Sequence, residues 1–168
     1  MTTPSATVGF RAMWTAARPD LDTSPMDIVG PVKRIEALVT TALEPLYGGA
    51  PITAPELDVL VQIRHAEAPV IARRLAETLG CSRAAVGKTL AKLEKRGFVE
   101  RRPSPADRRA ALVTVTPTGC DAIDDMFPRQ LAVEAELLDG LGADRDRVVE
   151  ALNLLEQVLK QRAGRRRA

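Results

Sequence analysis

The chain has 168 residues, of which 45% are hydrophobic and 27% charged, a composition typical of an ordinary globular protein. No apolar run approaches the ~18 residues that a membrane-spanning helix needs, and the amino terminus lacks the pattern of a secretory signal. We therefore expect a cytoplasmic protein that contacts no membrane. Two cysteines and one histidine are too few for a structural zinc site, so we expect no metal and no cofactor.

The formal net charge is only +2, but the charges are distributed unevenly. Residues 70–112 hold 11 Lys and Arg against 4 Asp and Glu, whereas residues 113–159 hold 3 against 10. A basic block beside acidic segments is typical of a module that binds a polyanion such as nucleic acid. A solvated face of internal ion pairs would give the same counts, so the pattern of elements must decide.

The amino-terminal part predicts two helices. Residues 5–18 predict a short helix that carries the only tryptophan, Trp14. Ser24 and Pro25 have the pattern of an N-cap followed by a first helical residue, and apolar residues at helical spacing extend this second helix to about Tyr47.

Three helices follow, over residues 53–66, 70–79 and 83–96. Thr53 and Glu56 form a capping box at the start of the first. Gly80 suits the left-handed residue of a tight turn, and Ser82 can cap the third helix. The periodicity then alternates over residues 98–102 and 111–116, which predicts a β-hairpin with a basic tip.

The carboxyl-terminal part predicts two more helices. Thr116 and Pro117 begin the first, and Asp144 caps the second. The second helix carries an apolar stripe that we interpret as a packing seam: Val148, Leu152, Leu155 and Leu159.

The helices over 53–96 and the hairpin have the order of a winged helix-turn-helix. Ala76 is small where the helices cross, and Val86 is an apolar anchor that leaves the opposite face of the last helix free. On that recognition helix the residues that could contact bases and phosphates are Ser82, Arg83, Ala84, Lys88, Thr89 and Lys92. We therefore predict a mainly α fold with a small β-hairpin, a winged helix-turn-helix with a helical dimerisation region.

Four runs of the sequence carry a resemblance to a known family. The runs over residues 75–86, 93–102, 105–109 and 115–119 resemble the MarR-type transcriptional regulators. The resemblance implies an obligate homodimer, built from the long amino-terminal helix and the last two helices, with an effector pocket between these helices and the DNA-binding lobe. It also implies that Asp107 braces the wing while Arg108 or Arg109 enters the minor groove.

The helix with Trp14 resembles an addition found in the subgroup that senses urate and other small anions or phenols. Matched position by position, the resemblance implies an effector site of four residues: Trp14, Asp58, Lys88 and Arg102. Lys88 departs from the arginine of that subgroup, and a lysine cannot hold a planar anion in the same bidentate way. The alternative is that Trp14 packs the added helix onto the dimer.

These observations predict four parts: dimerisation helices over 1–50, the DNA-binding lobe over 51–116, further dimerisation helices over 117–163, and a basic tail over 164–168. The predicted function is a dimeric repressor that binds a pseudo-palindromic operator and is released by a small anionic or phenolic ligand. An effector-independent architectural or constitutive regulator is the alternative. No nucleophile–base pair or glycine-rich phosphate loop suggests an enzyme. Cys81 lies near Arg83 just before a helix start, a setting in which thiols are reactive, so a redox switch at Cys81 stays an alternative.

Overall fold

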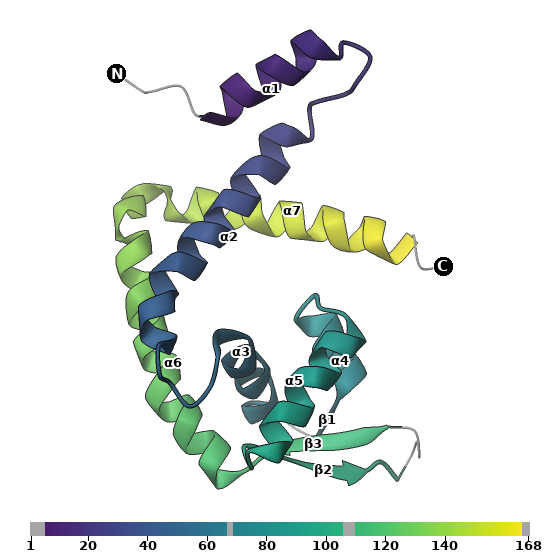
Figure 1. Ribbon diagram of the computed structural model, residues 1–168, viewed down its shortest axis with the longest axis vertical. Helices are drawn as coiled ribbons and strands as arrows, with labels where there is room; N and C mark the ends of the chain where they lie inside the picture. The colour runs from purple at the N-terminus through teal and green to yellow at the C-terminus, as the bar shows by residue number, and fades with distance from the viewer. Residues whose placement is uncertain (1–5, 67–68, 106–109, 166–168) are drawn as a thin grey trace. The chain divides into compact units, whose positions relative to one another are not determined.

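The computed structural model describes residues 6–66, 69–105 and 110–165, and the chain divides into two units, Met1–Val133 and Glu134–Ala168. The helices are α1 (Ala6–Ala17), α2 (Met26–Tyr47), α3 (Ala54–Arg64), α4 (Ala72–Thr78), α5 (Arg83–Lys95), α6 (Pro117–Leu138) and α7 (Arg145–Arg165), with the 3-10 helix η1 (Asp139–Asp144) before α7 (Figure 1). The strands are β1 (Val70–Ile71), β2 (Val99–Pro103) and β3 (Ala111–Val115). This mainly helical chain with a small sheet confirms the predicted fold class.

The sheet has three antiparallel strands in the order β1-β3-β2, one more than the predicted hairpin. The prediction of a helix over 70–79 was wrong at its start, because Val70 and Ile71 pair with β3 and α4 begins only at Ala72. Both residues are β-branched, which favours a strand, and Val70 pairs directly with Val113. The strand therefore anchors the start of α4 to the wing.

The core lies in the first unit, where α3, α4, α5, the sheet and α6 bury their apolar faces against one another. Ala76 and Val86 are both buried, as the helix-turn-helix pattern predicted. The largest fully buried side chains are Ile52, Leu57, Leu60, Leu75, Leu90, Leu93, Met126 and Val113. Because this core fixes α5 from one side, it sets which side of α5 meets the solvent.

A buried carboxylate joins the start of α3 to the end of α5. The capping box is present, and Oε2 of Glu56 accepts a hydrogen bond from the Thr53 amide at 2.8 Å. Its other oxygen lies 2.6 Å from Nη2 of Arg96, whose Nη1 donates to the Pro51 carbonyl at 2.9 Å. Burial raises the pKa of Glu56, but the hydrogen bonds from Arg96 and Thr53 outweigh it and hold the pKa below its usual value.

Glycines with positive φ end both helices of the helix-turn-helix, α4 and α5. Gly80, at φ 65°, lets the Cys81 amide bond the Ala76 carbonyl at 3.0 Å, which closes α4. Gly97, at φ 75°, ends α5 in the same way. The sequence pattern predicted this role for Gly80, whereas the role of Gly97 was not predicted.

The start of α6 lies close to the chain that leads into β2. Thr116 begins the helix as predicted: its hydroxyl accepts the Gly119 amide at 3.1 Å and donates to the Gly97 carbonyl at 2.6 Å. A Cβ on Gly119 would overlap the Phe98 carbonyl oxygen and lie 2.7 Å from Cγ1 of Val115. Only glycine fits this approach.

The start of α2 differs from the prediction. The helix begins at Met26, and Ser24 makes no side-chain cap. Instead, the Asp22 carboxylate accepts the Ser24 amide at 2.9 Å, a local turn that leads the chain into Pro25. The helix ends at Tyr47 as predicted, where the tyrosine hydroxyl donates to Gln130 of α6.

The second unit consists of the last turn of α6, η1 and α7. The last helix begins directly after Asp144, whose carboxylate accepts a hydrogen bond from Arg147 at 2.6 Å. It continues to Arg165, so the helix extends two residues into the predicted tail. Among the described residues, no helix combines the length and apolar character that crossing a membrane requires.

Candidate nucleic-acid interface

The recognition helix α5 is fixed on one face and free on the other. Val86, Leu90 and Leu93 are buried, and the Ser82 hydroxyl accepts the Ala85 amide at 3.1 Å at the start of the helix. The face opposite these leucines carries the exposed residues Ala84, Lys88, Lys92 and Lys95 at helical spacing. Lys95 was not among the predicted contacts, although its spacing from Lys88 and Lys92 in the sequence places it on the same stripe.

The other predicted residues of α5 have partners within the helix or lie toward its edge. Thr89 is half-buried and its hydroxyl donates to the Ala85 carbonyl at 3.2 Å. The Ser82 hydroxyl serves as the N-cap. Arg83 is exposed, but it lies three residues before the buried Val86 and is therefore on the Val86 side of the helix, away from the lysine stripe.

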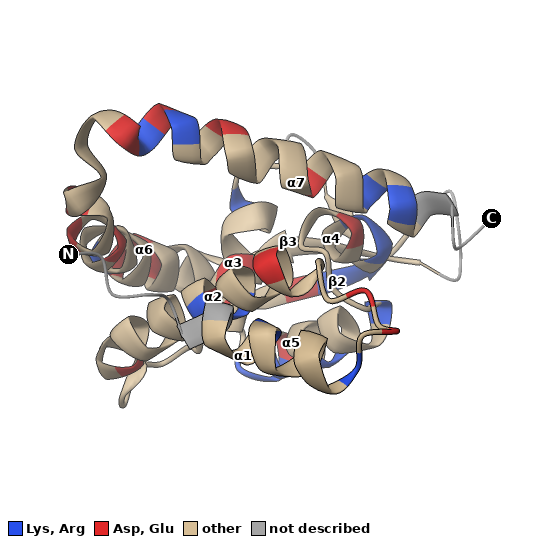
Figure 2. Ribbon diagram, turned by 90° about the horizontal axis from the view of Figure 1, so that it is seen from above, with Lys and Arg blue, Asp and Glu red and all other residues tan. Residues whose placement is uncertain are grey.

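Most described arginines of the basic block outside α5 form ion pairs, with Arg74 as the exception, whereas the cations of α5 do not. Elsewhere in this block the arginines that pair with carboxylates inside the chain are Arg73 with Glu77, Arg96 with Glu56, Arg101 with Glu94 and Arg102 with Glu100. Within the described ranges, Arg83, Lys88, Lys92 and Lys95 make no ion pair. Figure 2 shows Lys and Arg in blue near α4 and β2, and also on α7. Among the described residues of this block, the free cations are therefore Arg74 on α4 and the four of α5, and only α5 carries a row of them on its exposed face.

The wing consists of β2, β3 and the loop between them. The register pairs Val99 with Val115 and Pro103 with Ala111, and the Ser104 amide bonds the Ala110 carbonyl at 3.0 Å beyond the last pair. Asp107, Arg108 and Arg109, predicted to form the wing tip, lie outside the described residues, so their role stays a prediction.

The four residues of the predicted effector site lie on four different elements. Trp14 is on α1 and packs edge to face on Phe10, with ring centroids 6.5 Å apart. Asp58 and Lys88 are exposed on α3 and α5, and Arg102 on β2 pairs with Glu100 at 3.3 Å. Three cavities lie in the first unit, between α3 and α4, beside β3 and at α1, and none of these three is lined by any of the four residues.

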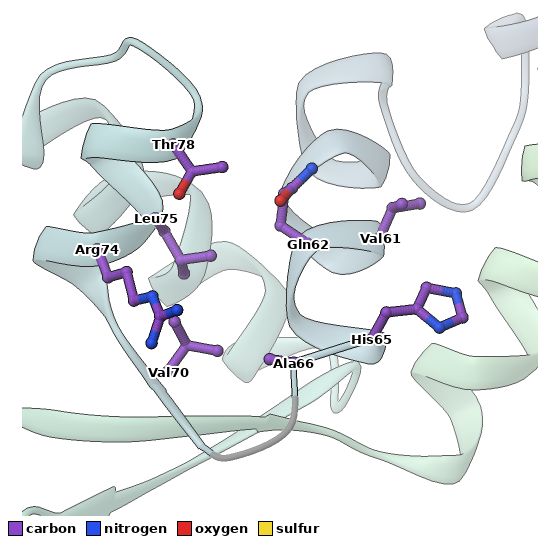
Figure 3. Close-up of a pocket in the computed structure, with 8 residues that line it drawn as sticks. All are labelled: Val61, Gln62, His65, Ala66, Val70, Arg74, Leu75 and Thr78. Atoms are coloured by element: carbon purple, nitrogen blue, oxygen red, sulfur yellow. The ribbon is translucent and has the colours of Figure 1, made fainter.

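The largest of these cavities, about 560 Å³, lies between α3 and α4. Figure 3 shows Arg74 and Thr78 on α4 across from Gln62 on α3. Val70 and Leu75 form an apolar floor, and both are buried. Arg74 has no ion pair within the part of the chain that the structure describes. An apolar floor with one free guanidinium could hold a small organic anion.

Metal-ligating side chains and thiols are sparse around the interface. Within the described residues, no group of three or more His, Cys, Asp or Glu side chains could hold a metal ion. Cys81 is exposed before α5, with its Sγ 3.4 Å from the Leu79 carbonyl oxygen, whereas Cys120 is half-buried.

Comparisons with known proteins agree with this geometry. The MarR family model matches residues 52–111, from just before α3 to the start of β3. The HTH-type transcriptional regulator PecS of Dickeya dadantii is 26% identical over 141 residues, which cover 83% of this chain and 85% of that protein. The multiple antibiotic resistance protein MarR of Salmonella typhimurium is 31% identical over 118 residues, 70% of this chain and 78% of that protein.

Solved structures extend the likeness over most of the chain. The transcriptional repressor CouR bound to a 23-mer DNA duplex has a TM-score of 0.68 and 25% identity, covering 81% of this chain and 98% of that chain. CouR from Rhodococcus jostii RHA1 bound to p-coumaroyl-CoA has a TM-score of 0.66 and 26% identity, covering 79% and 92%. With its winged helix-turn-helix and these relatives, the chain belongs to the MarR family of transcriptional regulators.

Proposed function

We propose that the protein is a dimeric, sequence-specific repressor that lays α5 in the major groove of DNA. The observation that carries this proposal is the row of exposed, unpaired lysines on the outer face of α5, within the described ranges: Lys88, Lys92 and Lys95. The core holds the other face rigidly, so these cations reach a polyanion without rearrangement of the helix. The DNA-bound relative CouR supports the proposal, and a regulator of this kind would act in the cytoplasm.

Two copies are needed for useful specificity. One recognition helix reads only a few base pairs, whereas two copies related by a two-fold axis read half-sites ~34 Å apart. We assign residues 51–116 to the DNA-binding lobe, 1–50 and 117–163 to dimerisation, and 164–168 to a basic tail. The stripe on α7 supports this assignment, since Val148, Leu152 and Leu159 are 36%, 50% and 59% exposed in the single chain, while Leu155 is half-buried.

A small organic anion is the proposed effector, and the chain offers two places for it. One is the site that the resemblance implies, with Trp14, Asp58, Lys88 and Arg102. The other is the cavity between α3 and α4, where the lining residue Arg74 makes no ion pair within the described part of the chain. A ligand there would act on DNA binding because α4 packs directly on α5. The ligand-bound relative CouR supports small-molecule control.

Selection of genomic fragments with the purified protein tests the DNA-binding proposal. We expect a pseudo-palindromic sequence bound by two copies, with an affinity that falls steeply as salt is raised, because each neutralised phosphate releases counterions. Binding to all fragments alike would instead support the architectural alternative, and no binding at low salt would contradict the proposal.

A panel of small aromatic and aliphatic acids, added to the operator complex, tests the effector. Release that Arg74→Ala abolishes and Arg102→Ala leaves intact would place the anion in the α3–α4 cavity, and the reverse would favour the site with Trp14. If no acid changes the operator affinity or the thermal stability of the protein, the result would support the effector-independent alternative.

A further inference from the structure

One ion pair joins the wing to the recognition helix. Nε of Arg101 on β2 lies 3.5 Å from Oε2 of Glu94, in the last turn of α5. The two elements lie against each other (Figure 1), and among the described residues no other ion pair or side-chain hydrogen bond joins them. The Arg101 and Glu94 side chains are 28% and 42% exposed, so solvent screens the pair only in part.

Alternation along β2 places Arg101 on the side of the strand that faces the core. Val99, two residues earlier, is buried, whereas Glu100 and Arg102 are exposed on the other side. Arg101 also stands opposite the buried Val113 of β3. Its side chain is therefore half-buried next to α5, while its two neighbours in the strand extend into solvent.

The guanidinium of Arg101 depends on Glu94 for compensation of its charge. Its Nε is buried and donates no hydrogen bond, and Glu94 is its one charged partner within the described ranges. A buried donor without a partner is costly, and neutralising Glu94 would remove the attraction that offsets this cost. The arginine would then turn toward water, and β2 would lose its side-chain contact with α5.

A short turn of Arg96, Gly97 and Phe98 connects α5 to β2. Backbone bonds fix the start of the strand, since the Phe98 amide donates to the Leu93 carbonyl at 3.0 Å. Arg101 lies three residues beyond Phe98, so the ion pair adds a second point of attachment further along the strand. Two points of attachment resist a change in the angle between the wing and the helix, which one point cannot do.

Glu94 is the one acidic residue of α5, and it directly precedes Lys95 on a helix that otherwise carries only cations. A carboxylate on a surface that meets DNA phosphates opposes binding by like-charge repulsion. The charge of Glu94 alone would therefore weaken DNA binding, whereas its contact with Arg101 would strengthen it by holding the wing. The two effects have opposite signs, so a single substitution can distinguish them.

We infer that Glu94 and Arg101 are positioning residues, which hold the wing at the angle to α5 that lets both elements meet one duplex. The inference rests on the proposed function, because it concerns the two elements assigned to DNA binding. Neither side chain needs to touch DNA for this role. A partly exposed ion pair contributes little to folding, so the effect belongs to operator binding and not to stability.

Neutralising Glu94 tests the inference. Operator affinity is measured by fluorescence anisotropy over a range of salt concentrations, with the operator obtained by genomic selection. We expect Glu94→Gln to weaken operator binding about fivefold or more. The slope of log affinity against log salt should also fall by about 0.9 for each phosphate contact that the wing loses. The midpoint of urea unfolding should stay that of the parent.

Glu100→Gln is the matched control, because it removes the same charge from the exposed side of β2, where the pair with Arg102 joins no second element. It should leave the operator affinity unchanged or raise it. If Glu94→Gln also binds the operator as tightly as the parent or more tightly, the inference is overturned and the proposed function stands.

Arg101→Gln shows whether Glu94 acts through the arginine. In that variant the pair is already absent, so adding Glu94→Gln should not weaken operator binding further. The same several-fold loss with and without Arg101 would overturn the inference, because Glu94 would then act on something other than the wing. If the parent protein binds no DNA fragment selectively, the proposed function itself fails, and the inference fails with it.

Discussion

Glu56 joins the start of α3 to the end of α5 through its two carboxylate oxygens. It is 5% exposed and accepts hydrogen bonds from both the Thr53 amide and Arg96. Because Glu56 is both the cap of α3 and the ion-pair partner of Arg96, its loss removes both contacts, at the start of α3 and at the end of α5. The cap was predictable because it is local, whereas the pair with Arg96 was not, because that arginine lies 40 residues away along the chain.

We expect Glu56→Gln to lower the free energy of unfolding by about 2 kcal/mol at neutral pH. The pKa of Glu56 is lower in the folded protein than its usual 4.5, so its charge stabilises the fold fully above that value. This contribution disappears as the pH falls through the folded-state pKa. The difference between the two proteins in urea unfolding should therefore shrink below about pH 4.

Glu77→Gln is the control for Glu56, because its pair with Arg73 is exposed on both sides. We expect a change of only a few tenths of a kcal/mol, about 0.3 kcal/mol. A loss from Glu56→Gln that stays constant from pH 7 to pH 3 would show that packing, and not the carboxylate charge, is responsible.

Gly119 carries a second prediction, on the approach of α6 to Phe98. Gly119→Ala places a methyl group against the Phe98 carbonyl oxygen, which is backbone and cannot move alone. We expect a loss of about 2–3 kcal/mol in the free energy of unfolding, measured by urea titration. Gly87→Ala in α5 is the matched change, because a Cβ there meets nothing within 4 Å. It should leave stability unchanged or raise it by about 0.5–1 kcal/mol. Equal effects of the two substitutions would contradict the proposed clash.

At the scale of elements, the first residues of those helices that have a capping side chain could be predicted from the sequence. The strand β1 could not. Ser82 and Thr116 cap α5 and α6 as expected, because the residues of a cap lie within four positions of one another. In contrast, β1 has two residues and exists only because Val70 pairs with Val113, 43 residues away. Ser24 does not cap α2, and the Asp22 carboxylate instead accepts the Ser24 amide in a turn before the helix. Local signals alone could not show such contacts.

The recognition helix carries a prediction of its own. Lys88→Ala together with Lys92→Ala should weaken operator binding about tenfold or more at moderate salt. Each lost phosphate contact should also reduce the slope of log affinity against log salt by about 0.9. Lys33→Ala on α2, also exposed, is the control and should change neither quantity. A double variant that retains the parent slope in fluorescence anisotropy would exclude this face of α5 from the phosphate backbone.

At the scale of the whole molecule, function depends on whether two recognition helices are held at a fixed spacing. One recognition helix reads only a few base pairs, so in the proposed dimer the two copies together would determine specificity. The apolar surface of α7 suits this role, yet it is not restricted to one stripe, because Val149, Leu154 and Val158 are also 47%, 64% and 46% exposed. Sequence spacing favoured one face of α7, and a matched pair of substitutions can test that choice.

Leu152 lies on the predicted stripe of α7, and Leu154 lies two residues on, toward the opposite face. Leu152→Glu places a charge in the proposed interface, where burying it unpaired is costly. We therefore expect a monomer by sedimentation. Operator binding should also be lost at concentrations where the parent protein binds. Leu154→Glu introduces the same charge in the same helix and should remain dimeric. If Leu154→Glu dissociates the protein and Leu152→Glu does not, the interface is on the other face of α7; if neither does, α7 does not hold the dimer, and the spacing of the recognition helices must be set by α2 and α6.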